Sequence, residues 1–258
     1  MRFIRYQSGL VDNPRCGWVL EDKVGPIEGD LFGEYRRLEA DIPIEKIRLL
    51  APVVPGKIIC VGRNYVEHAR EHNVEVPDLP LLFLKPPSSV IGPGEKIVSP
   101  PQSEKVEHEA ELAVVIGKPG RWIVPERALD YVFGYTIGND VTARDLQRRD
   151  GQWTRAKGFD TFCPLGPWIE TDLDPADTLI TCRVNEEMRQ MASTREMVFT
   201  VAQIIAFAST VMTLLPGDVI MTGTPAGVGQ LNPGDVVEAT IEGIGVLRNP
   251  VIAEERRS

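Results

Sequence analysis

The sequence predicts a mixed α+β protein that is mostly β. Apolar runs of strand length recur along the chain, and Gly or Pro bounds most of them. Few helical patterns lie between these runs, which argues against the regular strand–helix alternation of a doubly wound α/β fold. The chain has 258 residues, of which 43% are hydrophobic and 25% charged, values typical of a globular protein with a large core. The runs, between Ile58 and Ile241, are IICVG, LLFL, LAVVIG, VFGYTIG, VIMTG and VVEATI.

Residues 1–53 are predicted to form a small β-rich N-terminal domain. FIRY and CGWVL are strand candidates, and Ile42 to Leu50 are expected to form a short helix. The segment from Pro52 to Gly56 contains two prolines and a glycine, which interrupt regular structure. We therefore expect a domain boundary there, followed by a larger domain over residues 54–258.

One long helix is predicted in the C-terminal part of the chain. Thr200 and Gln203 have the spacing of a capping box, in which each side chain satisfies a free backbone N–H at the helix start. We expect the helix to end near Leu215, because Pro216 and Gly217 follow. Apolar residues recur at helical spacing within it: Val201, Ile204, Ile205, Ala208 and Val211.

Charge and cysteine usage limit the classes of partner. The formal net charge is −9, which disfavours nucleic acid as a ligand. No apolar run reaches the roughly 18 residues of a membrane span, and the N-terminus lacks the apolar stretch of a secretory signal. We expect a cytoplasmic protein without a membrane partner, whose cysteines are buried and reduced. The cysteines form no C-x-x-C pair: Cys16, Cys60, Cys163 and Cys182.

The strongest candidate site combines three carboxylates. Glu109 and Glu111 precede the apolar run AVVIG, and alternation along a strand points both to one face. Asp140 follows the strand candidate VFGYTIG, and Thr142 with Asp145 can cap a helix after it. Three carboxylates suit a hard cation such as Mg²⁺ or Mn²⁺. Taken alone, these acidic residues equally fit a solvated strand face and helix caps.

A second candidate site lies in GRNYVEHAREH. Asn64 can cap a helix here, and His68 and Glu71 then share a face of it. A carboxylate beside an imidazole makes a general base for water. The same stretch reads H-x-x-E-H, the inverted zinc-peptidase pattern, with His68 and His72 as zinc ligands. A solvated charged helix is the third interpretation.

Two further segments carry candidate substrate contacts. Lys157 lies among aromatic and apolar residues, so it can be buried beside an anion such as a substrate carboxylate, or exposed in a loop. The segment TGTPAGVG, which contains Thr224, offers glycines for close backbone approach and hydroxyls for hydrogen bonds. It lacks the Lys-Ser/Thr ending of a phosphate-binding P-loop, and it also fits a plain structural turn.

Taken together, these segments resemble the fumarylacetoacetate hydrolase family. The resemblance runs from about Lys57 to Val246, whereas the N-terminal unit matches only loosely. Its specificity comes from the order of six motifs: GRNYVEHARE, LFLKP, HEAELAVVIG, GYTIGNDVTARDLQ, WTRAKGFDTFCPLGPWI and LLPGDVIMTGTPAGVG.

The resemblance implies a β-roll catalytic domain of the family's C-terminal type. It implies a divalent metal held by Glu109, Glu111 and Asp140, and catalytic Lys157 near the substrate. It further implies that His68 and Glu71 lie on a lid and act on water, and that the protein is a homodimer. Residues that the resemblance places along the substrate pocket are Arg144, Gln147 and Thr224.

The implied substrates are small 2-oxo or 2,4-dioxo acids, and three reactions stay open on the same site. Water delivered to a C4 ketone gives C–C hydrolysis, as with an acylpyruvate or fumarylpyruvate. Proton movement alone gives isomerisation, as with 2-hydroxyhepta-2,4-diene-1,7-dioate. Loss of CO₂ gives decarboxylation, as with oxaloacetate. In each reaction, the positive charge of the bound metal ion would stabilise a negatively charged enolate. Outside this class, a zinc peptidase and a non-catalytic binding protein remain alternatives.

Overall fold

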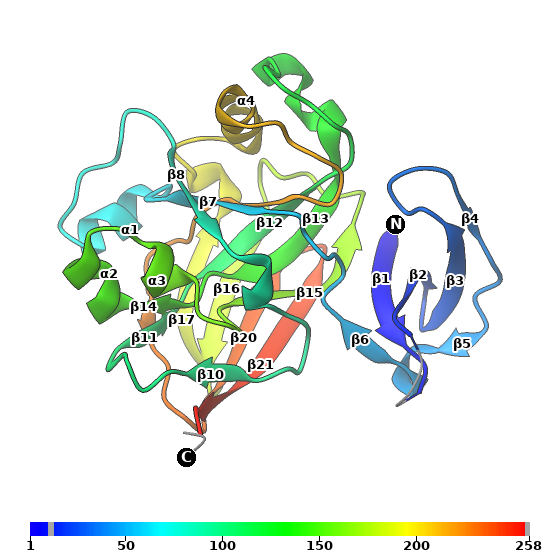
Figure 1. Ribbon diagram of the computed structural model, residues 1–258, viewed down its shortest axis with the longest axis horizontal. Coiled ribbons are helices and arrows are strands. Elements are labelled where there is room, and N and C mark those ends of the chain that lie inside the picture. The colour runs from blue at the N-terminus through cyan, green and yellow to red at the C-terminus, as the bar shows by residue number, and fades with distance from the viewer. Residues whose placement is uncertain (10–12, 256–258) are drawn as a thin grey trace.

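The structure, a computed structural model, describes residues 1–9 and 13–255 and confirms the mostly β fold (Figure 1). Its largest element is a 13-stranded sheet, of which β5 (Ile42–Pro43), β6 (Arg48–Leu50) and β9 (Val90–Ile91) lie off the main path. The main path runs in the spatial order β4 (Tyr35–Arg37), β3 (Lys23–Gly29), β2 (Arg15–Leu20), β1 (Arg2–Gln7), β15 (Cys163–Glu170), β13 (Val132–Asn139), β12 (Ala110–Ile116), β18 (Val219–Met221), β7 (Ile58–Gly62) and β8 (Leu81–Lys85).

Two smaller sheets complete the β structure. The five-stranded sheet packs against β12 and β13. It contains β10 (Ile97–Ser99), β21 (Gly245–Ala253), β20 (Val236–Ile241), β16 (Leu179–Val184) and β17 (Glu187–Ser193). The three-stranded sheet contains β14 (Thr142–Ala143), β11 (Val106–His108) and β19 (Gly229–Gln230).

Strand β12 is apolar along its length because it is buried on both faces. Leu112 and Val114 pack into the core between the large and five-stranded sheets, whereas Ala113 and Val115 pack into a separate core on the opposite face. A strand that is covered on both sides has a continuous run of apolar residues in its sequence. This strand could therefore be predicted from the sequence. Its end therefore provides a rigid support for the side chains that follow.

The helices are short, apart from α4 (Val201–Val211). The capping box of Thr200 and Gln203 is present. The helix ends before Leu215, because Leu214 instead exchanges backbone hydrogen bonds with Gly120. None of the described helices is long and apolar enough to cross a membrane. The others are α1 (Val66–Glu71), α2 (Arg144–Asp150), α3 (Thr154–Lys157) and the 3-10 helices η1 (Ile44–Lys46), η2 (Pro87–Ser89), η3 (Pro125–Tyr131) and η4 (Thr194–Glu196).

The N-terminal strands lie to one side of the molecule, away from α1, α2 and α3 (Figure 1). Strand β1 nevertheless pairs with β15, with Phe3 opposite Ile169, so one sheet runs through both parts of the chain. The prediction of a helix over Ile42 to Leu50 is wrong. In this segment β5 pairs with β3 and β6 pairs with β1, and only the short 3-10 helix η1 lies between them. The division at residue 53 stays a prediction.

The cysteines form no disulfide bond. Cys60, Cys163 and Cys182 are buried, and Cys16 is partly buried. Burial raises the pKa of the Cys163 and Cys182 thiols to about 12, so both are protonated at neutral pH.

Candidate active site

Three carboxylates meet where β12 begins and β13 ends. The antiparallel register puts Ala110 opposite Asn139, and the backbone N–H of Asp140 donates to the Glu109 carbonyl at 2.8 Å. Glu109, Glu111 and Asp140 are at most 4% exposed, and one oxygen from each lies within 4.8 Å of the other two. The sheet register thus brings together carboxylates that are about 30 residues apart in sequence.

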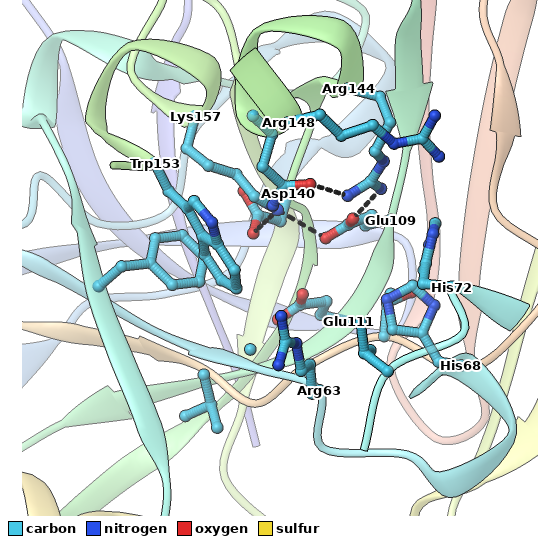
Figure 2. A pocket seen from close by; sticks show the side chains of 16 residues that line it. Arg63, His68, His72, Glu109, Glu111, Asp140, Arg144, Arg148, Trp153 and Lys157 are labelled. Carbon is cyan, nitrogen blue, oxygen red and sulfur yellow. Dashed lines mark hydrogen bonds and ion pairs between the residues drawn. The ribbon is translucent and has the colours of Figure 1, made fainter. Parts of the chain in front are cut away.

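Buried cations contact two carboxylates of this triad, and Figure 2 shows Lys157 and Arg144 beside them. The Lys157 ammonium donates to Glu109 Oε2 and to Asp140 Oδ2, at 2.7 Å each. Lys85, on β8, donates to the other Asp140 oxygen at 2.6 Å. Arg144 forms ion pairs with Glu109 and with Glu107, whose Oε2 lies 2.6 Å from Arg144 Nε. Lys157 therefore has protein carboxylates as partners, where the sequence suggested a substrate carboxylate.

The pKa shifts follow from burial and from the unequal sharing of these cations. Burial raises the pKa of Glu109, but Lys157 and Arg144 lower it by more, so this carboxyl is ionised. The pKa of Glu111 is well above its ordinary value, because burial, Asp140 and Glu109 all disfavour its charge. Burial lowers the pKa of Lys157, yet Asp140 and Glu109 raise it overall. Glu111 therefore has the least compensated charge of the triad.

The donor set fits a hard divalent cation. The three residues offer only carboxylate oxygens, which Mg²⁺ and Mn²⁺ prefer. Glu111 accepts a hydrogen bond from the Gly223 backbone N–H at 2.7 Å. The other lone pairs of this carboxylate are left for a cation. A bound cation would also remove the repulsion that raises the Glu111 pKa.

Helix α1 places two histidines and a glutamate beside the triad. His68 Nδ1 lies 3.5 Å from Glu71 Oε2. Both Glu71 oxygens lie within 3.3 Å of the Gly227 backbone nitrogen, which connects α1 to the TGTPAGVG loop. The pKa of Glu71 is below its ordinary value, because His68 and the Gly227 N–H outweigh its burial. Burial, then Arg144 and His68, lower the pKa of His72, which favours a neutral ring.

Thr224 is held by a buried glutamine that the sequence analysis did not identify. Its hydroxyl donates to the Ala110 carbonyl at 2.9 Å and accepts from Gln190 Nε2 at 2.8 Å. Gln190 also donates to the Pro225 carbonyl and accepts from the Ala110 N–H at 3.1 Å. Gln190, on β17, therefore ties the TGTPAGVG loop to the strand that carries Glu111.

These groups line a cavity of about 220 Å³, small enough to favour a small molecule over a large cofactor. Gln147 lines it and accepts a hydrogen bond from Arg144 Nη1 at 2.6 Å. Figure 2 shows the carboxylates facing His68 and His72 on one side and Trp153 on another. The lining includes His68, Glu109, Glu111, Asp140, Arg144, Gln147, Lys157 and Thr224 from the sequence analysis, with Arg63 and Arg148 in addition.

Two capping predictions are wrong. The Asn64 side chain does not cap α1, because it is buried and bonds Phe199 and the Thr222 carbonyl. The Thr142 hydroxyl donates to the Asp140 carbonyl, while Asp145 accepts from the Ser103 hydroxyl. Helix α2 has no side-chain cap. Asn64 and Asp145 thus bond distant segments, whereas Thr142 bonds a carbonyl two residues before it.

Two family models match the chain. Residues 57–252 match the C-terminal domain of fumarylacetoacetate hydrolase, and residues 1–52 match an N-terminal domain described as Rv2993c-like. An uncharacterized protein of Methanocaldococcus jannaschii is 56% identical over 203 residues, covering 79% of this chain and 86% of that protein. A mitochondrial oxaloacetate tautomerase of Rattus norvegicus is 46% identical, covering 98% of this chain and 92% of that protein.

Solved structures also resemble this chain over nearly its whole length. The crystal structure of 2-hydroxyhepta-2,4-diene-1,7-dioate isomerase from Mycobacterium marinum superposes with a TM-score of 0.92 at 44% identity. The match covers 99% of this chain and all of that one. The similarity therefore includes the N-terminal strands as well as the part that carries the cavity.

Proposed function

The chain belongs to the fumarylacetoacetate hydrolase family, and from this membership we propose a divalent-metal-dependent isomerase of small 2-oxo dicarboxylic acids. The observation that carries the proposal is that His68 lines one small cavity with Glu109, Glu111 and Asp140, while Glu71 lies 3.5 Å from His68. The histidine of a proton-transfer dyad and a hard-cation site thus face the same volume. The proposed cation is Mg²⁺ or Mn²⁺.

The carboxylate triad would hold the cation, which supplies positive charge against the negative charge that develops on a 2-oxo oxygen. Lys157 stays bound to Glu109 and Asp140, so it fixes the orientation of two of the proposed ligands. Arg63 and Arg148 line the cavity and add positive charge for a second substrate carboxylate. This arrangement favours a dicarboxylic over a monocarboxylic acid.

His68 is the proposed proton carrier. Because the Glu71 carboxyl is ionised at neutral pH, it would accept a hydrogen bond from Nδ1–H of His68 and so leave Nε2 with a free lone pair. That nitrogen can remove a proton from the carbon next to the 2-oxo group and return it elsewhere. The Nδ1–Oε2 distance of 3.5 Å would shorten once a substrate fills the cavity.

C–C hydrolysis is the second candidate reaction. The same dyad can remove a proton from water, so that the hydroxide adds to the C4 ketone of an acylpyruvate or fumarylpyruvate. The C3–C4 bond then breaks to give a carboxylic acid and the enolate of pyruvate, and the proton returns to C3. The family is described by its hydrolase member, whereas the two named relatives are an isomerase and a tautomerase. Because isomerisation and tautomerisation move a proton without cleaving a C–C bond, as the names of both relatives indicate, isomerisation is the first choice and oxaloacetate decarboxylation the third.

A substrate panel tests the proposal. Rates with Mg²⁺, with Mn²⁺ and with EDTA would be compared for 2-hydroxyhepta-2,4-diene-1,7-dioate, the keto and enol forms of oxaloacetate, acetylpyruvate and fumarylpyruvate. We expect isomerisation or tautomerisation to be fastest and to stop in EDTA. Activity that EDTA leaves intact would contradict the metal requirement. Absence of turnover on the whole panel would favour the non-catalytic binding protein.

Assembly and location stay predictions. We propose a homodimer, to be tested by light scattering after gel filtration, and a cytoplasmic enzyme. Membership of this family gives the zinc-peptidase interpretation of H-x-x-E-H no support.

A further inference from the structure

We propose that His68, Glu71 and His72 form a second cation site, distinct from the carboxylate triad, that binds Zn²⁺. One ligand atom from each residue lies within 4.8 Å of the other two. The proposed reaction uses His68 and Glu71 but gives His72 no role. A metal site accounts for all three residues of the H-x-x-E-H motif without a peptidase activity.

The spacing of the three residues suits one metal ion. Positions i, i+3 and i+4 share a helix face, so α1 and the residue that ends it present the three side chains together. A tetrahedral zinc ion with ligands at about 2.0–2.2 Å separates neighbouring ligand atoms by about 3.3–3.6 Å. His68 Nδ1 and Glu71 Oε2 lie 3.5 Å apart. The two imidazole rings meet edge to face, with centroids 4.7 Å apart, on one side of the cavity (Figure 2).

Unsatisfied nitrogens are the second observation. His68 is 7% exposed, and within residues 1–9 and 13–255 no hydrogen bond satisfies its Nδ1. The same holds for His72 Nε2, another buried atom. Buried polar atoms without partners are costly and rare, and a bound cation is one of their explanations. Both nitrogens belong to residues of the proposed site.

The donor types separate the two sites. Two imidazoles with one carboxylate match the His₂Glu set of catalytic zinc sites, which keep a fourth position open. The triad offers only carboxylate oxygens, which suit Mg²⁺. The hydrogen bonds from Gly227 N–H fix the Glu71 carboxylate before a metal arrives, as partners of metal ligands commonly do. Each site therefore selects its own ion.

Calorimetric titration of the full chain with ZnCl₂, in excess Mg²⁺, tests the site. We expect one zinc ion to bind, and His72→Gln to weaken it about tenfold or more, since even the loss of a ligand's partner costs about 10–100-fold. Glu71→Gln is a second variant with the same expectation. Glu67→Gln, an exposed change on the same helix, is the matched control and should leave the zinc affinity unchanged.

The outcome separates the two sites. Asp140→Asn should retain zinc binding if α1 supplies the ligands. Zinc binding that survives His72→Gln but disappears in Asp140→Asn would overturn the proposal and assign zinc to the triad. Absence of zinc binding to the unmodified chain would overturn it as well.

Zinc should also inhibit turnover, because it would occupy His68 and Glu71; this consequence rests on the proposed function. Inhibition is measured in excess Mg²⁺, relative to each variant's own rate without zinc. We expect the inhibitory zinc concentration to rise about tenfold or more in His72→Gln, in parallel with the binding constant. Zinc that binds at α1 without inhibiting would support the site and contradict the assigned role of His68 and Glu71.

Discussion

The Lys85 ammonium lies 2.6 Å from Oδ1 of Asp140, and both side chains are almost completely buried. Lys85 approaches from β8, on the edge of the large sheet, while Lys157 binds the other oxygen of the same carboxylate. Two cations from separate segments thus bind the two oxygens of this buried carboxylate. We therefore expect the stability of this site to depend on whether a cation occupies the proposed metal position.

Lys85→Met should destabilise the metal-free protein, because Asp140 then keeps Lys157 as its buried cationic partner but loses the second cation. The loss should stay below about 3–5 kcal/mol, the cost of a buried charge without any partner. A divalent cation would replace part of the missing positive charge, so Mg²⁺ should stabilise this variant more than the unmodified protein. Urea unfolding with EDTA and with Mg²⁺ measures both effects.

Lys57→Met provides the matched control. Lys57 forms an ion pair with buried Asp218, and neither residue lines the cavity. This variant should also lose stability, but Mg²⁺ should restore none of the loss. Equal recovery of both variants by Mg²⁺ would contradict the local coupling at Asp140.

Glu111→Gln should make the metal-free protein more stable and unable to bind Mg²⁺. The pKa of Glu111 is well above its ordinary value, since burial and the neighbouring carboxylates disfavour its ionised form. Glutamine keeps the shape and removes the charge, so we expect the free energy of unfolding of the metal-free protein to rise. Thermal unfolding in EDTA measures the gain, and calorimetry measures Mg²⁺ binding. A less stable variant that still binds Mg²⁺ would show that the triad is not a metal site.

The parts of this site that the sequence predicted are those encoded by local patterns. Glu109 and Glu111 stood out because they precede an apolar strand, and Asp140 because it follows one. Helix α4 was recognisable from the box formed by Thr200 and Gln203. In each case the information lies within a few neighbouring residues.

The contacts that the sequence analysis missed join distant segments. Lys85 meets Asp140 across 55 positions, and Gln190 meets Ala110 across 80. No spacing rule relates such pairs, since the sheet register alone brings them together. Asn64 illustrates the opposite error. Its local pattern indicated a helix cap, but its side chain instead forms hydrogen bonds with Phe199 and Thr222.

Glu107→Gln should change the pH dependence of stability. Burial raises the pKa of Glu107, but Arg144 lowers it by more, so the folded-state pKa is below the unfolded value. Such a carboxyl adds stability above an unfolded pKa of about 4.3 and loses it as the pH falls through the folded pKa. The variant should be about 1.5–3 kcal/mol less stable at pH 7, the value of a hydrogen bond to a charged group. This difference should shrink below about pH 4.3.

Urea unfolding between pH 7 and pH 3, with EDTA throughout, measures this difference. Glu126→Gln, an exposed change on η3, serves as the control and should alter stability by no more than about 0.5 kcal/mol at any pH. A difference for Glu107→Gln that stays constant over the whole range would mean that Arg144 does not hold this carboxyl ionised.

His68→Ala distinguishes the proton carrier from the metal ligands. Loss of a general base costs about 10²–10⁴-fold in rate, so kcat for isomerisation should fall within that range and hydrolysis should be abolished. Mg²⁺ affinity should not change, because His68 is not among the triad. Oxaloacetate decarboxylation, which needs no base to remove a proton, should fall least.

Asp140→Ala should abolish all three reactions together with Mg²⁺ binding, and Arg70→Gln, on the exposed side of α1, should affect none of them. Decarboxylation and isomerisation that fall by the same factor in His68→Ala would show that the histidine supports the site as a whole, and its assignment as the proton carrier would be wrong.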